Sequence, residues 1–337
     1  MRKDAANGFC RISTRALAAV LAVVFILAAA AWGEEEIVRR YSYTERREFA
    51  WEEGKPLVVR ESGGTIYASG WGKKDIKVKA VKTAYAPRLT LARRNAALLN
   101  VAIEAPHDRI SIRTVNPTIR TGQMRSYTDY SLNVPREINL DLKTVEGGIY
   151  VAGVKGDVAA RTASGTISLK GISGAATAET ETGELVLTDC DNLRFAKAAS
   201  AAISFSITGK EPGPAGAPPG KGPKETGGPP AKTLAADAEL RNERGTISIT
   251  FPEDTPLILD VTAPAGKIEA AEAKVTVSAE AGDDSGSDGD SLENRKYYSG
   301  GGGGARITVY TAAGEVIIKT TPRADERDIR EKNYIVR

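Results

Sequence analysis

The chain has little of what most catalytic and metal centres require. Its 337 residues include one histidine, His107, and two cysteines, Cys10 and Cys190. Triads that pair Ser or Cys with His would all need His107, and a second His is missing for a histidine-based zinc site. His107 follows Pro106 in an expected turn, where a lone histidine is a solvated surface residue. We therefore expect no catalytic residue, no metal and no cofactor.

The chain also lacks an excess of charge once its first 33 residues are set aside. The formal charge of the whole chain is +3, and residues 1–33 carry four basic residues and one Asp, so the remainder has a formal charge of zero. Basic residues precede the apolar run Ala16–Trp32, which predicts a cleaved signal peptide and an exported protein, periplasmic, secreted or on the cell surface. The alternative is an uncleaved inner-membrane anchor at residues 16–32. A chain without a concentrated positive face is not expected to bind nucleic acid.

Disulfides are excluded as well. Removal of the leader takes away Cys10, so Cys190 is the only cysteine left. It lies in the repeat position of Val154 and Ile172, which predicts a small apolar core residue.

What the chain does have is a repeat of 18 residues. Apolar residues fall in step at Ile149, Ile167, Leu185 and Ile203, and again two places later at Val151, Leu169, Leu187 and Phe205. Two places before each first member stand Gly147, Gly165, Gly183 and Ala201. The segments between the glycines are short, β-branched and alternating, so they predict strands. A constant period of this kind is typical of stacked coils that bury their inner faces against their neighbours.

A charged column supports this interpretation. Lys143, Arg161, Glu179 and Lys197 are also 18 residues apart, and stacking would place them in one outward column at steps of roughly 4.8 Å. The last three alternate in sign, as cross-strand pairing favours.

The predicted fold is all-β, a right-handed β-solenoid with one short helix at Pro87–Leu99; the alternative is a β-sandwich-like fold. Similar Gly-x-Ile/Val units begin at Gly64, Gly245, Gly266 and Gly314. The expected segments are a leader at 1–33, an N-terminal β region at 34–135, regular coils at 136–208, a disordered Gly/Pro-rich insert at 209–233, further coils at 234–281, a disordered acidic and Gly-rich loop at 282–304, a terminal coil at 305–322 and a tail at 323–337.

Two groups of acidic residues are candidates for a chemical role, one for calcium binding and one for catalysis. Asp284, Asp288 and Asp290 are spaced somewhat like a calcium loop, but Gly286 fills a ligand position and Arg295 stands where the distal Glu belongs, which favours a solvated loop. Glu179 and Glu181 share an outward face, with Glu184 and Asp189 nearby, and could serve a polysaccharide-cleaving enzyme. An exposed flat strand offers no burial to raise a carboxyl pKa, which argues against catalysis.

Three stretches carry a family resemblance: "GGTIYASGWGKKDIKVKA" at 63–80, "YSLNVPREINLDLKTVEGGIYVAGVKGDV" at 130–158, and the Gly-x-Ile copies that follow. They resemble the bacterial DUF4097 group, described as putative adhesins, over most of residues 50–320. The resemblance implies an exported, non-enzymatic β-solenoid that presents strand faces to a protein or glycan of the cell surface or envelope. An envelope scaffold or stress-response accessory is the alternative, and a polysaccharide-active enzyme the less favoured one.

Overall fold

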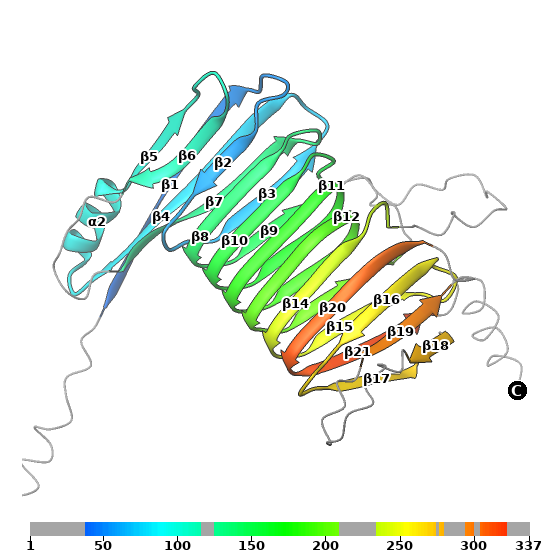
Figure 1. Cartoon of the computed structure of the whole chain (residues 1–337). Helices are drawn as coiled ribbons and strands as arrows, with labels where there is room; N and C mark the ends of the chain where they lie inside the picture. The colour runs from blue at the N-terminus through cyan, green and yellow to red at the C-terminus, as the bar shows by residue number, and fades with distance from the viewer. Residues whose placement is uncertain are drawn as a thin grey trace, which may run out of the picture.

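All strands of the structure belong to one mixed, hydrogen-bonded sheet of 21 strands. The computed structural model describes residues 38–115, 125–208, 234–273, 276–279, 294–299 and 304–321. The sheet curls along its length, and strands from the N-terminal and C-terminal regions lie at its opposite ends (Figure 1). Within it run two series of parallel strands, here called the long-strand ladder and the short-strand ladder.

The long-strand ladder is named after the longer strand of the regular repeats, as in β8 and β10, and all its neighbouring strands are parallel. In spatial order its members are β6 (Ile110–Val115), β2 (Leu57–Arg60), β8 (Leu140–Glu146), β10 (Val158–Ser164), the second halves of β11 (Ile167–Thr182) and β12 (Leu185–Ser200), β14 (Ala238–Arg244), β20 (Ala305–Ala313) and β16 (Leu257–Thr262).

The short-strand ladder contains the other strand of each repeat, again with parallel neighbours. In spatial order its members are β7 (Ser126–Pro135), β3 (Ile66–Trp71), β9 (Ile149–Ala152), the first halves of β11 and β12, β13 (Ile203–Ser206), β15 (Ile247–Pro252), β21 (Glu315–Thr321) and β17 (Lys267–Glu272).

Antiparallel strands are added where the parallel ladders end. At the N-terminal end, β5 pairs with β6, while β4 and then β1 extend the short-strand ladder beyond β7. At the other end, β19 pairs with β16 and β18 with β19. These strands are β1 (Arg39–Ala50), β4 (Asp75–Ala86), β5 (Asn100–Glu104), β18 (Thr276–Ala279) and β19 (Asn294–Ser299).

The predicted 18-residue register is confirmed in the regular part of the sheet. Ile167 is opposite Ile149 on one side and Leu185 on the other, and Leu185 is opposite Ile203. All four are buried. Inward residues of both ladders join one hydrophobic core that runs from Trp51 to Ile318. Because each strand contributes to the same core, burial of these ladders is the main source of stability.

The spatial order of the strands differs from their order in the sequence at both ends. The last unit of the chain, β20 and β21, lies between β14/β15 and β16/β17. Likewise β2 and β3 lie between β6/β7 and β8/β9. The 18-residue spacing predicts neighbours only where the repeat is uninterrupted, so sequence inspection did not reveal these insertions.

Four corners after a long strand, those that follow β8, β10, β11 and β20, share one construction, a threonine followed three residues later by a glycine. Gly165 has φ +139°, and a Cβ at this position would overlap the carbonyl oxygen of Gly147 in the neighbouring repeat. Thr162 is buried and its Oγ1 donates a hydrogen bond to that same carbonyl oxygen at 3.0 Å. The glycine therefore lets two backbones approach, and the threonine satisfies an acceptor that the approach buries. Positive φ recurs at the corners Gly147, Gly183 and Gly245.

Ala201 departs from this construction and is compensated by a neighbour. Among the described residues only Asp189 has positive φ without being glycine, so Ala201 turns the corner in ordinary backbone geometry. Its carbonyl oxygen accepts a hydrogen bond from Asn242 Nδ2 at 2.7 Å. Asn242 occupies the threonine position of the next repeat. Its longer side chain reaches the Ala201 carbonyl oxygen, which corresponds to the Gly147 oxygen that Thr162 binds.

The predicted helix is confirmed as α2 (Leu89–Leu98), whose buried residues Ala92, Asn95 and Ala96 lie on the side packed on β1 and β4. The loop predicted at 282–304 contains a strand, β19, because that segment pairs with the free edge of β16. The leader at 1–33, the insert at 209–233 and the tail at 323–337 lie outside the described residues. Within the described ranges, no helix has the length and hydrophobicity that a membrane crossing requires.

The corner construction predicts unequal effects of two Gly→Ala substitutions. Gly165→Ala combines an unfavourable φ with backbone overlap and should lower the free energy of unfolding by about 3 kcal/mol or more. Gly54→Ala is the matched control, because Gly54 also has positive φ, +87°, but no atom lies within 4 Å of the added Cβ. It should cost only about 1–2 kcal/mol. Urea unfolding of residues 34–337 followed by circular dichroism measures both, and equal losses would contradict a stacking role for the corner.

Candidate functional site

The outward side of the long-strand ladder, here called the long-strand face, carries a continuous column of charged side chains. The strand registers place one charged residue per strand in spatial order at Arg113, Arg60, Lys143, Arg161, Glu179, Lys197 and Arg241. The four predicted members are therefore confirmed as neighbours, and the column continues at both ends. Neighbouring strands are about 4.8 Å apart, so this spacing also separates the charged positions.

Several of these charges are already paired. Arg161 Nε lies 3.2 Å from Glu179 Oε1, Arg60 forms an ion pair with Asp141, and Arg241 lies 5.3 Å from the centre of the Tyr310 ring. Lys143 and Lys197 have no ion pair within the part of the chain that the structure describes. Exposed pairs of this kind contribute at most about 1 kcal/mol each. The two lysines are thus the members most available to an external anion.

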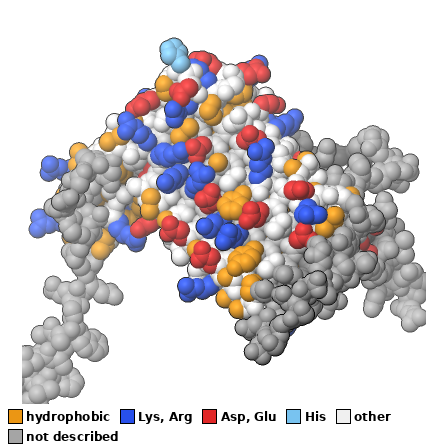
Figure 2. Space-filling view, viewed as in Figure 1, with side chains coloured by type: hydrophobic (Ala, Val, Ile, Leu, Met, Phe, Trp, Pro, Cys, Tyr) orange, Lys and Arg blue, Asp and Glu red, His pale blue; other side chains and the backbone are white. Residues whose placement is uncertain are grey.

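Charges of both signs are interleaved over the visible surface, and neither sign forms a broad patch there (Figure 2). The distribution agrees with the balanced composition of the chain beyond residue 33. An interleaved surface favours partners that match a pattern of charge over partners attracted by net charge alone.

The outward side of the short-strand ladder, here called the short-strand face, is mostly hydroxyl-bearing. Its central strands present two columns: Ser168, Val186, Ser204 and Ser248 form one, and Thr188 and Ser206 belong to the other. At its N-terminal part, the rings of Tyr67 and Tyr150 stack with centroids 4.9 Å apart and planes 12° apart. Each ring therefore covers one face of the other, and Tyr67 is 50% exposed.

The four acidic residues considered for catalysis do not form a catalytic pair. Glu179 is engaged by Arg161, and Glu181 and Glu184 are exposed to solvent. Asp189 is buried in a corner, where its carboxylate accepts hydrogen bonds from the Thr208 amide and hydroxyl at 2.7 and 2.6 Å. These bonds hold Asp189 at φ +52°, in the repeat position where Gly153 and Gly171 also have positive φ. The role of Asp189 is therefore to stabilise a corner.

The remaining candidate residues from the sequence are His107, Cys190 and the three aspartates of the acidic loop. His107 is exposed in a turn, as predicted. Cys190 is a buried free cysteine opposite Ile172, which confirms its position in the core. Asp284, Asp288 and Asp290 lie outside the described residues, and within the described residues no group of three or more His, Cys, Asp or Glu could hold a metal ion.

A buried polar cluster near the N-terminal end was not identified from the sequence. Glu61 is 5% exposed and hydrogen-bonded by the hydroxyl of Thr114, which lies 2.7 Å from the hydroxyl of fully buried Tyr130. Removal from water raises the pKa of Glu61, although the Thr114 hydroxyl and nearby backbone amides partly oppose that rise. Burial likewise raises the pKa of Tyr130. Glu61 occupies the threonine position of a corner, three residues before Gly64, and this was the one available signal.

A second buried charged residue, Lys82, lies in β4 at the same end of the sheet. Lys82 is 6% exposed and its Nζ lies 2.5 Å from Glu45 Oε2. Burial alone would raise the pKa of Glu45, but hydrogen bonds from Lys82 and Arg47 outweigh it, so that the pKa is lowered. The pKa values of the two carboxyl groups at this end are therefore shifted in opposite directions.

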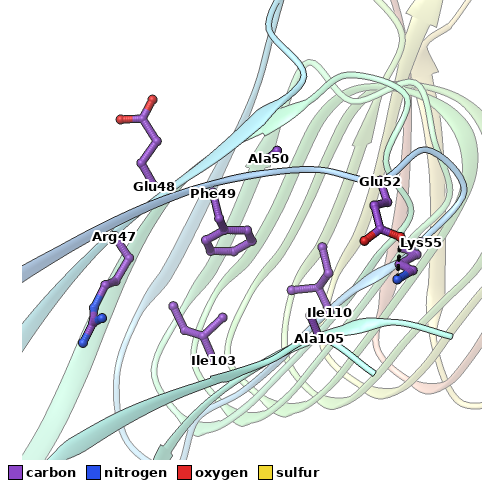
Figure 3. A pocket seen from close by; sticks show the side chains of 9 residues that line it. All are labelled: Arg47, Glu48, Phe49, Ala50, Glu52, Lys55, Ile103, Ala105 and Ile110. Atoms are coloured by element: carbon purple, nitrogen blue, oxygen red, sulfur yellow. Dashed lines mark ion pairs between the residues drawn. The ribbon is translucent and has the colours of Figure 1, made fainter. Parts of the chain in front are cut away.

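Two hollows open in the same region. The larger, of about 390 Å³, lies between β1 and β5/β6, with Phe49 facing Ile103 and Ile110 and the Lys55–Glu52 ion pair at its rim (Figure 3). The smaller, of about 280 Å³, lies between β1 and α2 and is lined by Tyr41, Tyr43, Lys82, Arg93 and Ala97. The first is an opening of the hydrophobic core where no further strand covers it.

Comparison with known proteins found similarity at the level of structure only. No family model matches the chain, and no curated protein matches it. A "putative cell adhesion protein" of Clostridium sporogenes is 10% identical, with 83% of this chain and 100% of that chain covered and a TM-score of 0.33. A "putative adhesin" of Bacteroides fragilis is 11% identical, with 83% and 97% covered and a TM-score of 0.35. A "putative adhesin" of Parabacteroides merdae is 10% identical, with 83% and 95% covered and a TM-score of 0.23. The chain is thus similar to adhesin-like structures at low identity, and this similarity is not evidence of function.

The raised pKa of Glu61 predicts a specific pH dependence of stability. A carboxyl whose pKa is higher in the folded than in the unfolded protein contributes fully below its ordinary value of 4.5, and the contribution is lost as pH rises through the folded pKa. Glu61→Gln keeps a neutral side chain at every pH. The stability of this variant relative to wild type should therefore increase from acid to neutral pH.

Urea unfolding at a series of pH values measures that difference. Glu181→Gln is the matched control, since it removes the same charge from an exposed site and should leave the difference nearly constant. A difference between Glu61→Gln and wild type that does not change with pH would show that burial of Glu61 does not control its ionisation.

Proposed function

We propose that this protein is an exported, non-enzymatic, adhesin-like protein whose chain coils as a right-handed β-solenoid and presents its strand faces to a partner of the cell surface or envelope. The leader at 1–33 supports export, and the parallel registers of the two ladders support coiling. The partner is a protein or a glycan, recognised by the polar side chains of the outward faces.

The observation that carries this proposal is the charged column of the long-strand face. Seven successive strands each contribute one charged residue, from Arg113 to Arg241, and the backbone hydrogen bonds of the ladder fix their spacing. A rigid row needs little ordering when it binds, which lowers the entropic cost of association. Such a row suits an extended partner that carries charges at regular intervals.

The absence of enzymatic activity is part of the proposal. Of the carboxylates suggested for catalysis, Glu179 forms an ion pair with Arg161 and Asp189 accepts hydrogen bonds from Thr208. Glu181 and Glu184 are exposed to solvent. A glycosidase needs two carboxyls placed across a substrate, one of them protonated at working pH. Glu179 and Glu181 point outward from one strand and so do not flank a substrate from two sides.

The proposal is tested by binding of residues 34–337 to isolated native envelopes. Lys143→Glu/Lys197→Glu reverses the two unpaired lysines of the column and should weaken binding about tenfold, which corresponds to about 1.4 kcal/mol. Lys73→Glu/Lys155→Glu is the matched control, because it makes the same charge change at exposed positions that lie outside the strands and so outside both strand faces. Its binding should equal that of wild type.

Two results would overturn the proposal. Equal binding by the two double variants would show that the charged column takes no part in recognition. Release of reducing ends from envelope polysaccharide by the wild-type protein, lost in Glu179→Gln/Glu181→Gln, would show an enzyme.

A further inference from the structure

The ribbon formed by β1 and β4, with α2 packed on it, is basic although the exported chain as a whole is neutral. Residues 38–44 and 76–99 contain eight Lys or Arg and no Asp or Glu. Two of the eight, Lys77 and Lys82, form ion pairs with residues of β1. The five arginines have no ion pair in the described ranges, and all are exposed: Arg39, Arg40, Arg88, Arg93 and Arg94. We call this set the basic end.

Helix α2 combines these arginines with exposed apolar side chains. Its buried side, Ala92 and Ala96, packs on the ribbon. On the remaining surface Leu89 is 55% exposed and Leu98 is 40% exposed, together with Arg93 and Arg94. Basic residues beside exposed leucines are typical of helices that lie in a membrane interface.

The adjacent strand shows the same combination. Val38 and Tyr43 of the ribbon are about half exposed, next to Arg39 and Arg40. Four of the seven large hydrophobic residues found exposed in the described structure therefore belong to this one region, namely Val38, Tyr43, Leu89 and Leu98. Charged residues on β1 also protect a free sheet edge from unwanted pairing. That explanation does not extend to α2, which has no strand edge.

A hollow of about 280 Å³ opens between the ribbon and the helix at this point. Tyr41 and Tyr43 line it together with Lys82 and Arg93. Lys82 is committed to Glu45, so Arg93 is the cation left to an incoming anion. Aromatic hydroxyls and a guanidinium group are suitable donors for the oxygens of a phosphate headgroup.

Chain length adds an independent constraint. Seven residue steps separate Trp32, the end of the apolar run, from Arg39, the first residue of β1. At full extension these steps span at most about 25 Å. An uncleaved leader would thus hold the basic end close to the bilayer, and a cleaved leader would leave this end free to bind the bilayer by itself.

We propose that the basic end docks on an anionic lipid surface. The five arginines attract the negatively charged headgroups, and Leu89, Leu98 and Tyr43 enter the boundary between headgroups and acyl chains. Docking leaves the two lysines of the charged column, Lys143 and Lys197, outside the contact. This inference does not depend on the proposed adhesive function, because it concerns a different part of the molecule and a different partner.

The test uses residues 34–337, without the apolar run, in co-sedimentation with two kinds of vesicle. One kind is pure phosphatidylcholine and the other is phosphatidylcholine mixed with phosphatidylglycerol. The protein should bind only the anionic vesicles. Arg88→Gln/Arg93→Gln/Arg94→Gln should weaken that binding on the order of 100-fold, because each basic residue at an anionic surface contributes about 1 kcal/mol. Added salt should weaken wild-type binding as well.

Two further variants keep the result specific. Lys143→Gln/Lys170→Gln/Lys197→Gln removes the same charge from the two strand faces and should bind as wild type. Leu89→Ser/Leu98→Ser keeps all arginines and should bind more weakly than wild type, because apolar insertion is lost. Cooperative urea unfolding of each variant shows that it is folded.

Several outcomes would overturn this proposal. These are failure of the wild-type protein to bind anionic vesicles, equal binding to neutral vesicles, and equal losses in the two triple variants. Full binding by Leu89→Ser/Leu98→Ser, with displacement by a soluble polyanion such as heparin, would instead identify a site for an acidic polymer. The envelope-binding test is therefore repeated in the Arg88→Gln/Arg93→Gln/Arg94→Gln background, so that lipid docking by the basic end does not mask a loss of binding by the charged column.

Discussion

The whole structure depends on close backbone contact at the corners after the long strands. Strands of a ladder stand about 4.8 Å apart, so the corners that join the two ladders must repeat at that distance too. Glycine removes the Cβ that would meet the preceding corner, as at Gly165 above Gly147. Threonine then satisfies the carbonyl group that this contact buries. A side chain at Gly165 would overlap the neighbouring backbone, and the apolar ladders on both sides of that corner would lose contact together.

The regular part of this arrangement could be predicted from the sequence because each of its features repeats locally. Ile149, Ile167 and Leu185 are equally spaced, and the structure places them side by side. The ends could not be predicted in the same way. Strands β20 and β21 are inserted between strands that precede them in the sequence. This placement depends on which strand edges are free to pair, and the spacing of residues within a repeat contains no information about it. The two opposite register shifts between β11 and β12, one after Ile172 and one after Ala176, have no local signal either.

The candidate sites could likewise be predicted only where their residues follow the repeat. The charged column follows the repeat, so four of its members were visible in the sequence, whereas Arg60 and Arg113 belong to strands out of sequential order. Glu61 was missed because the pattern treats its position as an ordinary polar corner. Only the packing of Tyr130 and Thr114 around it shows that it is a buried carboxyl. The basic end required the pairing of β1 with β4, which brings together arginines that are about fifty residues apart.

The position of the last unit has a consequence for how the protein is made. Strands β16 and β17 leave the ribosome before β20 and β21, yet in the finished molecule they are hydrogen-bonded to these later strands. Layer-by-layer folding during synthesis would therefore seat β16 and β17 directly on β14 and β15, in places that belong to the end of the chain. A polypeptide that stays unfolded until its synthesis is complete avoids this trap, since all its strands become available at nearly the same time.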